Sequence, residues 1–239
     1  MHAIHCFESA LAFDPGSIDT KAYLGLALNT RVLEQISVSS GDDLERAERL
    51  IDDVLQASPR HAVAHYARGQ LLRARGDYHG AIPEYEAALA VGRNWVAAIA
   101  SLGMCKFWAG ELDDAMRSQE LAIRLSPRDP RIPNWFWRIG MVHLLQSRLD
   151  DAIQWLEKAR ITNPTLPGPH AWLASAFALQ GDDQRAAASL AEARRLSPDQ
   201  RYTSIERFEA IQFLGSEKTR AIFRETYLVG LRKAGVPEH

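Results

Sequence analysis

Small and apolar residues recur along the chain with a fixed helical spacing. A small residue is followed by an apolar or long residue four positions later, by a small or apolar residue three positions after that, and usually by proline five further on. Because positions i, i+4 and i+7 share one face of an α-helix, each copy predicts an amphipathic helix that ends near its proline. The six copies are Ala3-Phe7-Ala10-Pro15, Ala47-Ile51-Val54-Pro59, Ala81-Tyr85-Ala88-Arg93, Ala115-Gln119-Ala122-Pro127, Ala152-Leu156-Ala159-Pro164 and Ala186-Leu190-Ala193-Pro198.

The copies follow one another at a nearly constant interval. Their leading alanines are 44, 34, 34, 37 and 34 residues apart. Each of the last five copies is preceded by a pair that ends in a small residue: Leu24-Gly25, Arg68-Gly69, Leu102-Gly103, Ile139-Gly140 and Leu173-Ala174. Small residues on facing helices allow close approach, and the residues between the two motifs are typical of tight turns: Gly76, Gly110, Ser147 and Gly181. The repeating unit is therefore helix, tight turn, helix and break.

This pattern resembles the tetratricopeptide repeat (TPR), a 34-residue helix–turn–helix unit. The resemblance covers Met1 to about Asp199 and implies an all-α fold, a right-handed α-solenoid of stacked repeats. The ranges are a half repeat at 1–15, full repeats at about 18–59, 62–93, 96–127, 133–164 and 167–198, and C-terminal capping helices at 200–239. The pattern departs from the family at Arg93, where proline is expected, and at Gln119, where an aromatic residue is expected.

Two further departures concern length and the start of the chain. The first full unit has ten extra residues around 35–43, which lengthen its helix pair or form a loop, and the fourth unit has three. The chain begins inside a second helix, so Met1 is either a natural start or the edge of a fragment of a longer protein.

A narrower resemblance covers residues from Gly76 to the end. The stretch "NWFWRIGMVHLLQSRLDDAIQWLEKARITNP" and the closing "LVGLRKAGVPEH" are similar to the C-terminal TPR region of bacterial class III adenylate and guanylate cyclases and of some winged-helix regulators. The resemblance implies a regulatory or scaffolding arm of a signalling protein. It brings no cyclase activity, because the repeats leave no room for a catalytic domain in these residues.

Residues 200–234 are helical by pattern but lie off the repeat. Ile205, Phe208 and Ile211 share one helix side, and Phe213 and Leu214 add apolar bulk before Gly215. Ser216 is a candidate N-cap for a second apolar face, which consists of Ile222, Phe223, Tyr227, Leu228 and Leu231. We expect these helices to cover the exposed end of the last repeat, as a solenoid requires.

Composition narrows the class of partner. The chain has 239 residues, is 46% hydrophobic and carries a formal net charge of −2, without the basic patch typical of nucleic-acid binders. It shows no secretory signal at its N-terminus and no apolar run long enough to span a bilayer. Its two cysteines, Cys6 and Cys105, show no metal-type spacing and suit a reduced, cytoplasmic setting as buried thiols.

Two groups of residues invite a chemical interpretation. His61 and His65 lie at i, i+4, a spacing that can hold zinc, but no carboxylate follows at a useful distance in the sequence. The acidic pairs Asp113-Asp114, Asp150-Asp151 and Asp182-Asp183 each begin a second helix, where acids cap free N–H groups and complement the helix dipole. We therefore expect no metal, no cofactor and no enzymatic activity within the chain.

The TPR resemblance assigns a candidate partner-binding surface. In TPR proteins, first-helix positions 2, 5, 9, 12 and 13 line the concave face. Carried over, these positions predict a partner-binding groove formed by Tyr66, Gln70, Arg73, Met104, Phe107, Trp108, Trp137 and Met141. Positions 5 and 9 lack the Lys and Asn with which some TPR proteins clamp a chaperone carboxylate. The groove is instead apolar, aromatic and Met-containing, which suits an apolar or amphipathic helix; otherwise the same side chains fill a tight superhelix.

The triplet Trp135-Phe136-Trp137 is predicted to divide its roles. Trp135 wedges against the preceding unit, Phe136 takes the core position of its repeat, and Trp137 alone faces the groove.

Three hypotheses for function remain. The first is protein–protein interaction with a peptide, a helix or another domain of a parent cyclase or regulator. The second is homodimerisation through an apolar N-terminal edge that contains Ile4, Phe7 and Leu11. The third is a small-molecule sensor with an aromatic pocket around Trp108 and Trp137. Neither a nucleic acid nor a membrane is an expected partner.

Overall fold

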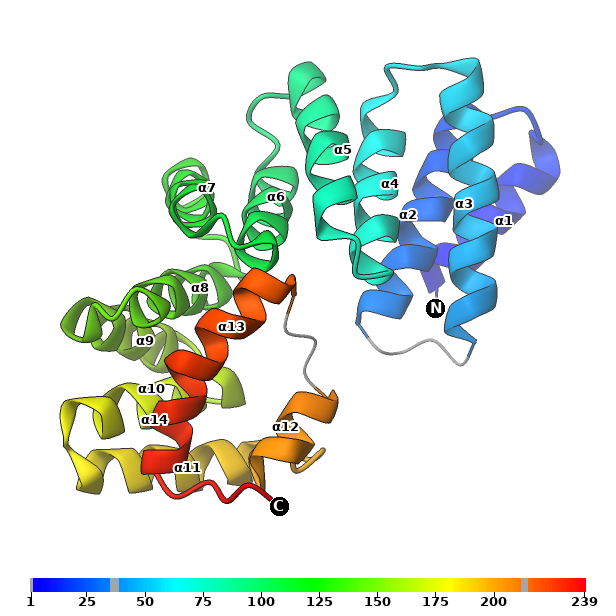
Figure 1. Cartoon of the computed structure of the whole chain (residues 1–239). Helices are drawn as coiled ribbons and strands as arrows, with labels where there is room; N and C mark the ends of the chain where they lie inside the picture. Colours follow the sequence, from blue (N-terminus) through cyan, green and yellow to red (C-terminus); the bar gives the residue numbers. More distant parts are fainter. Residues whose placement is uncertain (1, 35–38, 212–214) are drawn as a thin grey trace. The chain divides into compact units, whose positions relative to one another are not determined.

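The chain folds into helices throughout the part that can be described. The computed structural model describes residues 2–34, 39–211 and 215–239, and these contain fourteen helices and no strand (Figure 1). The predicted all-α fold is confirmed. The helices belong to two compact units, Met1–Cys105 (unit 1) and Lys106–His239 (unit 2).

Unit 1 consists of stacked antiparallel helix pairs. In it α2 packs on α3 and on α4, and α4 packs on α5, so the second helix of each pair lies against the first. Its helices are α1 (His2–Phe13), α2 (Ile18–Leu33), α3 (Ser40–Ala57), α4 (Ala62–Ala74), α5 (Tyr78–Val91) and the greater part of α6 (Val96–Ala109).

Unit 2 continues the pairs and then leaves the repeat. Its pairs are α8 with α9 and α10 with α11, and α14 packs on α10. After the end of α6 its helices are α7 (Leu112–Leu125), α8 (Ile132–Leu145), α9 (Leu149–Thr162), α10 (Pro167–Gln180), α11 (Asp183–Leu196), α12 (Ile205–Ile211), α13 (Glu217–Glu225) and α14 (Tyr227–Lys233).

Glycine allows the two helices of a pair to approach closely. A Cβ at Gly69 would lie 2.8 Å from the ring of Tyr85, and one at Gly140 would lie 2.6 Å from Cγ of Leu156. Both contacts are too short for real carbon atoms, so the large residue of the second helix fits only against glycine on the first. The two sequence motifs of each repeat are therefore the two halves of one contact.

The turn residues adopt the conformation that their sequence predicts. Gly76, Gly110 and Gly181 have φ angles of +79°, +86° and +84°, in the left-handed region that glycine enters without steric cost. Ser147 takes the equivalent position with φ of +59°. Each residue ends a first helix and reverses the chain into the second.

The extra residues of the first full unit lengthen its helices. α2 has 16 residues and α3 has 18, against 13 for α4 and 14 for α5. Residues 35–38 of this insertion lie outside the described part, as do Phe213 and Leu214.

The apolar edge predicted at the N-terminus packs inward. Ile4 is buried in a cluster with Leu24, Leu28 and Ile51, and Phe7 and Leu11 pack against the same cluster. Ile4 is therefore not free for a second copy, whereas Phe7 and Leu11 are only partly covered by the helix pair that follows, and homodimerisation through this edge stays a prediction. Phe13, at the end of α1, is 93% exposed.

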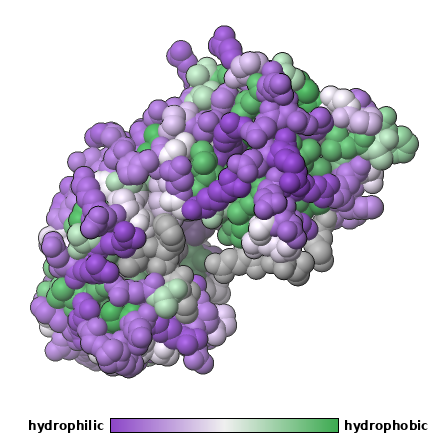
Figure 2. Space-filling view, turned by 45° about the vertical axis from the view of Figure 1, so that its right-hand side comes forward, coloured by the Kyte–Doolittle hydropathy of each residue, from purple (hydrophilic) through white to green (hydrophobic). Residues whose placement is uncertain are grey.

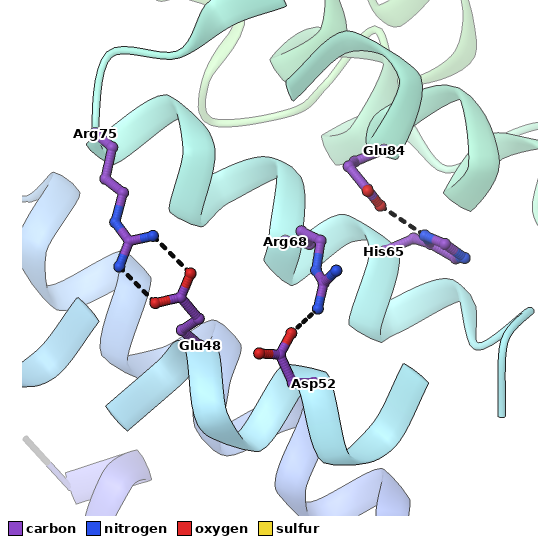
Figure 3. Close-up of polar contacts among 6 residues, drawn as sticks. All are labelled: Glu48, Asp52, His65, Arg68, Arg75 and Glu84. Carbon is purple, nitrogen blue, oxygen red and sulfur yellow. Dashed lines mark hydrogen bonds and ion pairs between the residues drawn. The ribbon is translucent and has the colours of Figure 1, made fainter. Parts of the chain in front are cut away.

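Ion pairs join neighbouring repeats of unit 1 (Figure 3). Arg75 donates two hydrogen bonds of 2.7 Å to the carboxylate of Glu48, and this contact lowers the pKa of Glu48. One turn further along α3, Asp52 pairs with Arg68. Exposed pairs of this kind contribute about 0–1 kcal/mol each, so they fix the register of α3 against α4 more than they stabilise it.

Hydrophilic side chains cover much of the molecular face that Figure 2 shows, with hydrophobic residues visible between them. Within the described residues, no helix combines the length and the apolar character needed to cross a membrane.

Candidate partner-binding surfaces

The eight predicted groove residues are divided between the two units. Tyr66, Gln70, Arg73 and Met104 belong to unit 1, and Phe107, Trp108, Trp137 and Met141 belong to unit 2. We call the surface on which the four residues of a unit lie the inner face of that unit.

On the inner face of unit 1, polar side chains bond to one another. Gln70 donates a hydrogen bond of 2.7 Å to the hydroxyl of Tyr66, one turn earlier on α4, and that hydroxyl lies 3.5 Å from Oγ of Ser101 on α6. The ring of Tyr66 packs against Trp95, with centroids 4.5 Å apart. Asn29 on α2 donates to the backbone carbonyl of Ala67 at 2.8 Å. This network ties α2, α4 and α6 together and makes the face more polar than its sequence indicates.

Arg73 is the charged group of this face. Its guanidinium is half-buried, and Nη1 lies 3.7 Å from the sulfur of Met104. Its Nε is buried without a hydrogen-bond partner, and no carboxylate lies within ion-pair distance of Arg73 among the described residues. By contrast, Arg68 and Arg75 on the same helix each have an acidic partner. Besides the thioether, the guanidinium lies near the phenols of Tyr78 and Tyr85, and because no carboxylate among the described residues pairs with it, it retains donors for a ligand.

On the inner face of unit 2, the predicted aromatic residues are covered by the chain itself. The ring of Trp108 stacks on Phe223 of α13, with centroids 5.7 Å apart. Phe107 meets the ring of Phe223 edge-on, with centroids 6.1 Å apart. Both residues are buried. Phe223 thus occupies the space beside Trp108 where the sensor hypothesis places a small-molecule pocket.

Two residues outside the predicted set complete this surface. Trp172 on α10 stacks on Tyr227 at 4.0 Å and meets Phe223 edge-on at 5.4 Å. Ser175, one turn later, donates a hydrogen bond of 2.9 Å to the backbone carbonyl of Tyr227. Ser175 takes the groove position of its repeat that Met104 and Met141 take in theirs, which is the signal that could have identified it.

The C-terminal helices therefore do more than cover the last repeat. α14 lies along α10, and the start of α13 reaches the end of α6, four helices earlier in the repeat array (Figure 1). Ser216 is the predicted N-cap of α13: its hydroxyl accepts a hydrogen bond from the backbone N–H of Thr219 at 3.3 Å.

The aromatic triplet divides in a different way from the prediction. Trp135 is buried, whereas Phe136 is half-buried and packs on Trp155 of α9 with centroids 5.6 Å apart. Trp135 is thus the core residue of the three. Trp137 places its ring against Gly168 of α10, where any Cβ would collide with it. The Trp137 ring therefore fastens α8 to the next repeat on the inner face of unit 2.

His61 and His65 have structural roles, because each contacts a backbone group and a carboxylate. His61 caps α4 by accepting from the N–H of Ala64 at 3.2 Å, and its other ring nitrogen lies 2.9 Å from Asp19. His65 lies 2.7 Å from Glu84 (Figure 3), and its other ring nitrogen lies 2.9 Å from the carbonyl of Pro59. The carboxylates come from other helices. Asp19 of α2 contacts His61, and Glu84 of α5 contacts His65. Among the described residues, no three His, Cys, Asp or Glu side chains gather as a metal site requires.

The acidic pairs also have separate partners. Asp182 caps α11 by accepting from the N–H of Arg185 at 3.0 Å, and the hydrogen bonds from Arg185 lower its pKa. A hydrogen bond from Arg117 likewise lowers the pKa of Asp114. Lowered pKa values keep these carboxylates ionised, whereas a general acid needs a raised one. The two thiols also differ, since Cys105 is buried and Cys6, expected to be buried, is exposed.

Comparison with known proteins decides the family. A model of the tetratricopeptide repeat matches residues 39–98 and 109–167, which contain the pairs α4 with α5 and α8 with α9. The chain is a tetratricopeptide repeat protein. No curated protein matches the sequence of this TPR protein.

Solved TPR structures share its fold. PilF of Pseudomonas aeruginosa is 16% identical with a TM-score of 0.64, covering 91% of this chain and 93% of its own. PilW, described as a type IV pilus biogenesis factor, is 17% identical with a TM-score of 0.62, covering 88% and 92%. YrrB, described as a TPR protein with an unusual peptide-binding site, is 20% identical with a TM-score of 0.59, covering 81% and 93%. At these identities the likeness establishes the fold alone.

Proposed function

We propose that this TPR protein binds a segment of another protein on the inner face of unit 1, where Arg73 receives an acidic group of that segment. A TPR fold supports a protein–protein interaction scaffold. YrrB, a chain of similar fold, carries a peptide-binding site. The observation that carries the proposal is the state of Arg73, a half-buried guanidinium beside the sulfur of Met104 that pairs with no carboxylate among the described residues.

The chemistry of the face defines the ligand. A guanidinium binds a carboxylate through two parallel hydrogen bonds, and such charge-assisted bonds are stronger than neutral ones. Beside Arg73, the thioether of Met104 offers an adaptable apolar contact. The proposed ligand is therefore a peptide or helix with a carboxylate next to an apolar side chain.

A peptide selection with a matched pair of variants tests this proposal. Peptides selected against the intact protein are expected to be rich in Asp or Glu next to an apolar residue. Arg73→Gln should weaken their binding by tenfold or more, because losing a charged hydrogen bond costs about 1.5–3 kcal/mol. Arg60→Gln, which removes the same charge from an exposed site before α4, should leave binding unchanged. Calorimetric Kd values that are equal for both variants would remove Arg73 from the site.

The wider context in the proposal is a bacterial, cytoplasmic signalling protein. The similarity of residues from Gly76 onward to the TPR arms of class III cyclases and winged-helix regulators supports this context. The partner segment then belongs to another domain or protein of the same signalling system. Sequencing the reading frame around this chain tests the assignment, since a neighbouring cyclase or DNA-binding domain is the expected finding and an unrelated domain contradicts it.

A further inference from the structure

The inner face of unit 2 already holds a helical ligand, and the ligand is one continuous segment of the chain. Residues 215–239 supply every group that touches Trp108, Trp172 and Ser175 in the contacts described above. The same segment also reaches α12, because the N–H groups of Ile205 and Glu206 donate to the carbonyls of Pro237 and Glu238 at 2.8 and 3.0 Å.

A polar anchor holds the start of the segment. The N–H of Ser216 and the hydroxyl of Thr219 both donate to the backbone carbonyl of Trp108, each at 2.8 Å. Trp108 lies in the last turn of α6, where carbonyls have no partner within their own helix. Gly215, with φ of +71°, fits this approach because a Cβ there would lie 2.5 Å from the same carbonyl oxygen.

An aromatic anchor holds its middle. Phe223 contacts Phe107, Trp108 and Trp172, and Tyr227 stacks on Trp172. Buried aromatic side chains in packed surroundings carry most of the binding energy in typical protein interfaces. The segment therefore has the contact pattern of a bound peptide, with a polar end and an aromatic centre.

Within the segment, α13 is held more lightly than α14, which buries Tyr227, Leu228, Gly230 and Leu231. Of its nine residues, Thr219 and Phe223 are the buried ones. Its charged residues Glu217, Lys218, Arg220, Arg224 and Glu225 are exposed. α13 alone therefore leaves its surface at a lower free-energy cost than α14 or the repeat helices, whose buried faces are larger, so α14 sets most of the cost of releasing the whole segment.

We propose that the inner face of unit 2 binds residues 215–239 of a second copy of the chain, in reciprocal exchange with its own segment. The exchanged segment makes the same contacts as the resident one, so exchange costs no contact energy and dimers form by mass action. Because the resident segment acts at an effective concentration of the order of millimolar, it excludes an external copy at low protein concentration. This inference concerns unit 2 and goes beyond the function proposed for unit 1.

A labelled peptide of residues 215–239 tests the surface. The Phe223→Ala chain, whose own segment lacks its aromatic anchor, should bind the peptide with an affinity at least tenfold above that of the native chain. The same peptide with Phe223→Ala should not bind. Arg220→Ala, on the exposed side of α13, should behave as the native chain does. A Phe223→Ala chain that keeps native helicity by circular dichroism and binds no peptide overturns the proposal.

A pair of complementary variants tests the occupant. Trp172→Leu damages the face but keeps the segment, and Phe223→Ala damages the segment but keeps the face. Mixed together, the two chains should form a one-to-one dimer by light scattering, and each alone should do so less. If the peptide binds but the mixture stays monomeric, a second copy is not the occupant and the proposal fails. Should Phe223→Ala lose its helicity, Thr219→Val, which removes the hydroxyl bonds to the carbonyl of Trp108 and to Ser216, takes its place in both experiments.

Discussion

The inner faces of the two units come from the same repeat pattern but are used differently. In unit 1 the face is held by side-chain hydrogen bonds and leaves Arg73 half-exposed. In unit 2 the corresponding face is aromatic and lies under α13 and α14. A repeat therefore specifies how its helices pack but not what its inner face binds, because residues of different chemistry occupy the inward positions of the two units.

The difference lies in a few side chains. At the same repeat position, unit 1 places Gln70 and Met104, and unit 2 places Met141 and Ser175. Gln70 turns to Tyr66 of its own helix, whereas Ser175 turns to the backbone of α14. The first arrangement joins two residues of one helix, and Oε1 of Gln70 stays buried without a hydrogen-bond partner. The second arrangement uses the polar side chain of Ser175 to hold α14.

Glycine substitutions should have the largest effect on the free energy of unfolding, and their effects should differ between the two units. A Cβ at Gly230 would lie 2.6 Å from the carbonyl oxygen of Ser175, so Gly230→Ala should lift α14 from α10. We expect a loss of about 1–3 kcal/mol in the free energy of unfolding, as overpacking usually costs. The tryptophan emission should shift to the red as Trp172 becomes exposed. Urea titration followed by fluorescence measures both quantities.

Two other glycines are controls for that substitution. Gly69→Ala in unit 1 should cost a similar free energy through its contact with Tyr85, but it acts inside a helix pair and should leave α14 in place. Gly41→Ala in α3 meets no atom within 4 Å and should stabilise the chain by about 0.5–1 kcal/mol, since alanine favours a helix. A Gly230→Ala chain with native stability and emission would mean that α14 is not held by this close contact.

The sequence predicts the repeat well because the repeat depends on local spacing. Gly69 and Tyr85 are 16 residues apart in one unit, and Gly76 between them turns the chain with a positive φ. Such contacts recur at the same interval in each repeat, so each copy supports the others. Ser216 is predictable for the same reason, because an N-cap acts within three residues.

The occupied face of unit 2 could not be predicted, because its contacts join distant residues through the backbone. Thr219 and Trp108 are 111 positions apart, and the acceptor is a carbonyl that every residue possesses. Carboxylates reach His61 and His65 from other helices in the same way, so spacing alone could not show them. The burial of Ile4 was missed because the pattern identifies an apolar helix face but not the neighbour that covers it.

Substitutions of helix caps should give a smaller effect that is similar in size in the two units. Ser17 caps α2 by accepting from Thr20 at 3.4 Å, and Ser216 caps α13 by accepting from Thr219 at 3.3 Å. Replacing either serine with alanine should cost about 1 kcal/mol, the usual effect of losing a cap. Hydrogen exchange should distinguish them, because the loss at Ser216 should speed exchange in α13 and leave α2 unchanged. Equal exchange rates in α13 of the two variants would mean that the cap does not hold this segment.

Acid titration should give the smallest effect. Asp199, which follows α11 in unit 2, accepts hydrogen bonds from Nε of Arg201 at 2.7 Å and from Oγ of Ser197 at 2.9 Å. The Arg201 guanidinium is the main cause that lowers the pKa of Asp199 from 3.8 to about 2. Because the folded state favours the ionised form, this carboxylate stabilises the fold above pH 4, and the contribution is lost as the pH falls from about 4 to about 2. Since Asp199 is about one-third exposed, we expect less than about 1 kcal/mol.

Asp199→Asn should therefore make the free energy of unfolding less dependent on pH across that range, as urea titrations at several pH values would measure. Glu48→Gln is the matched change in unit 1, where Arg75 lowers the pKa of Glu48 in the same direction. Both variants should flatten the acid limb, because in both units a guanidinium holds a carboxylate in its charged form. If only Asp199→Asn does so, the Glu48–Arg75 pair sets helix register without contributing to stability, and the two units differ in their ion pairs as they do in their inner faces.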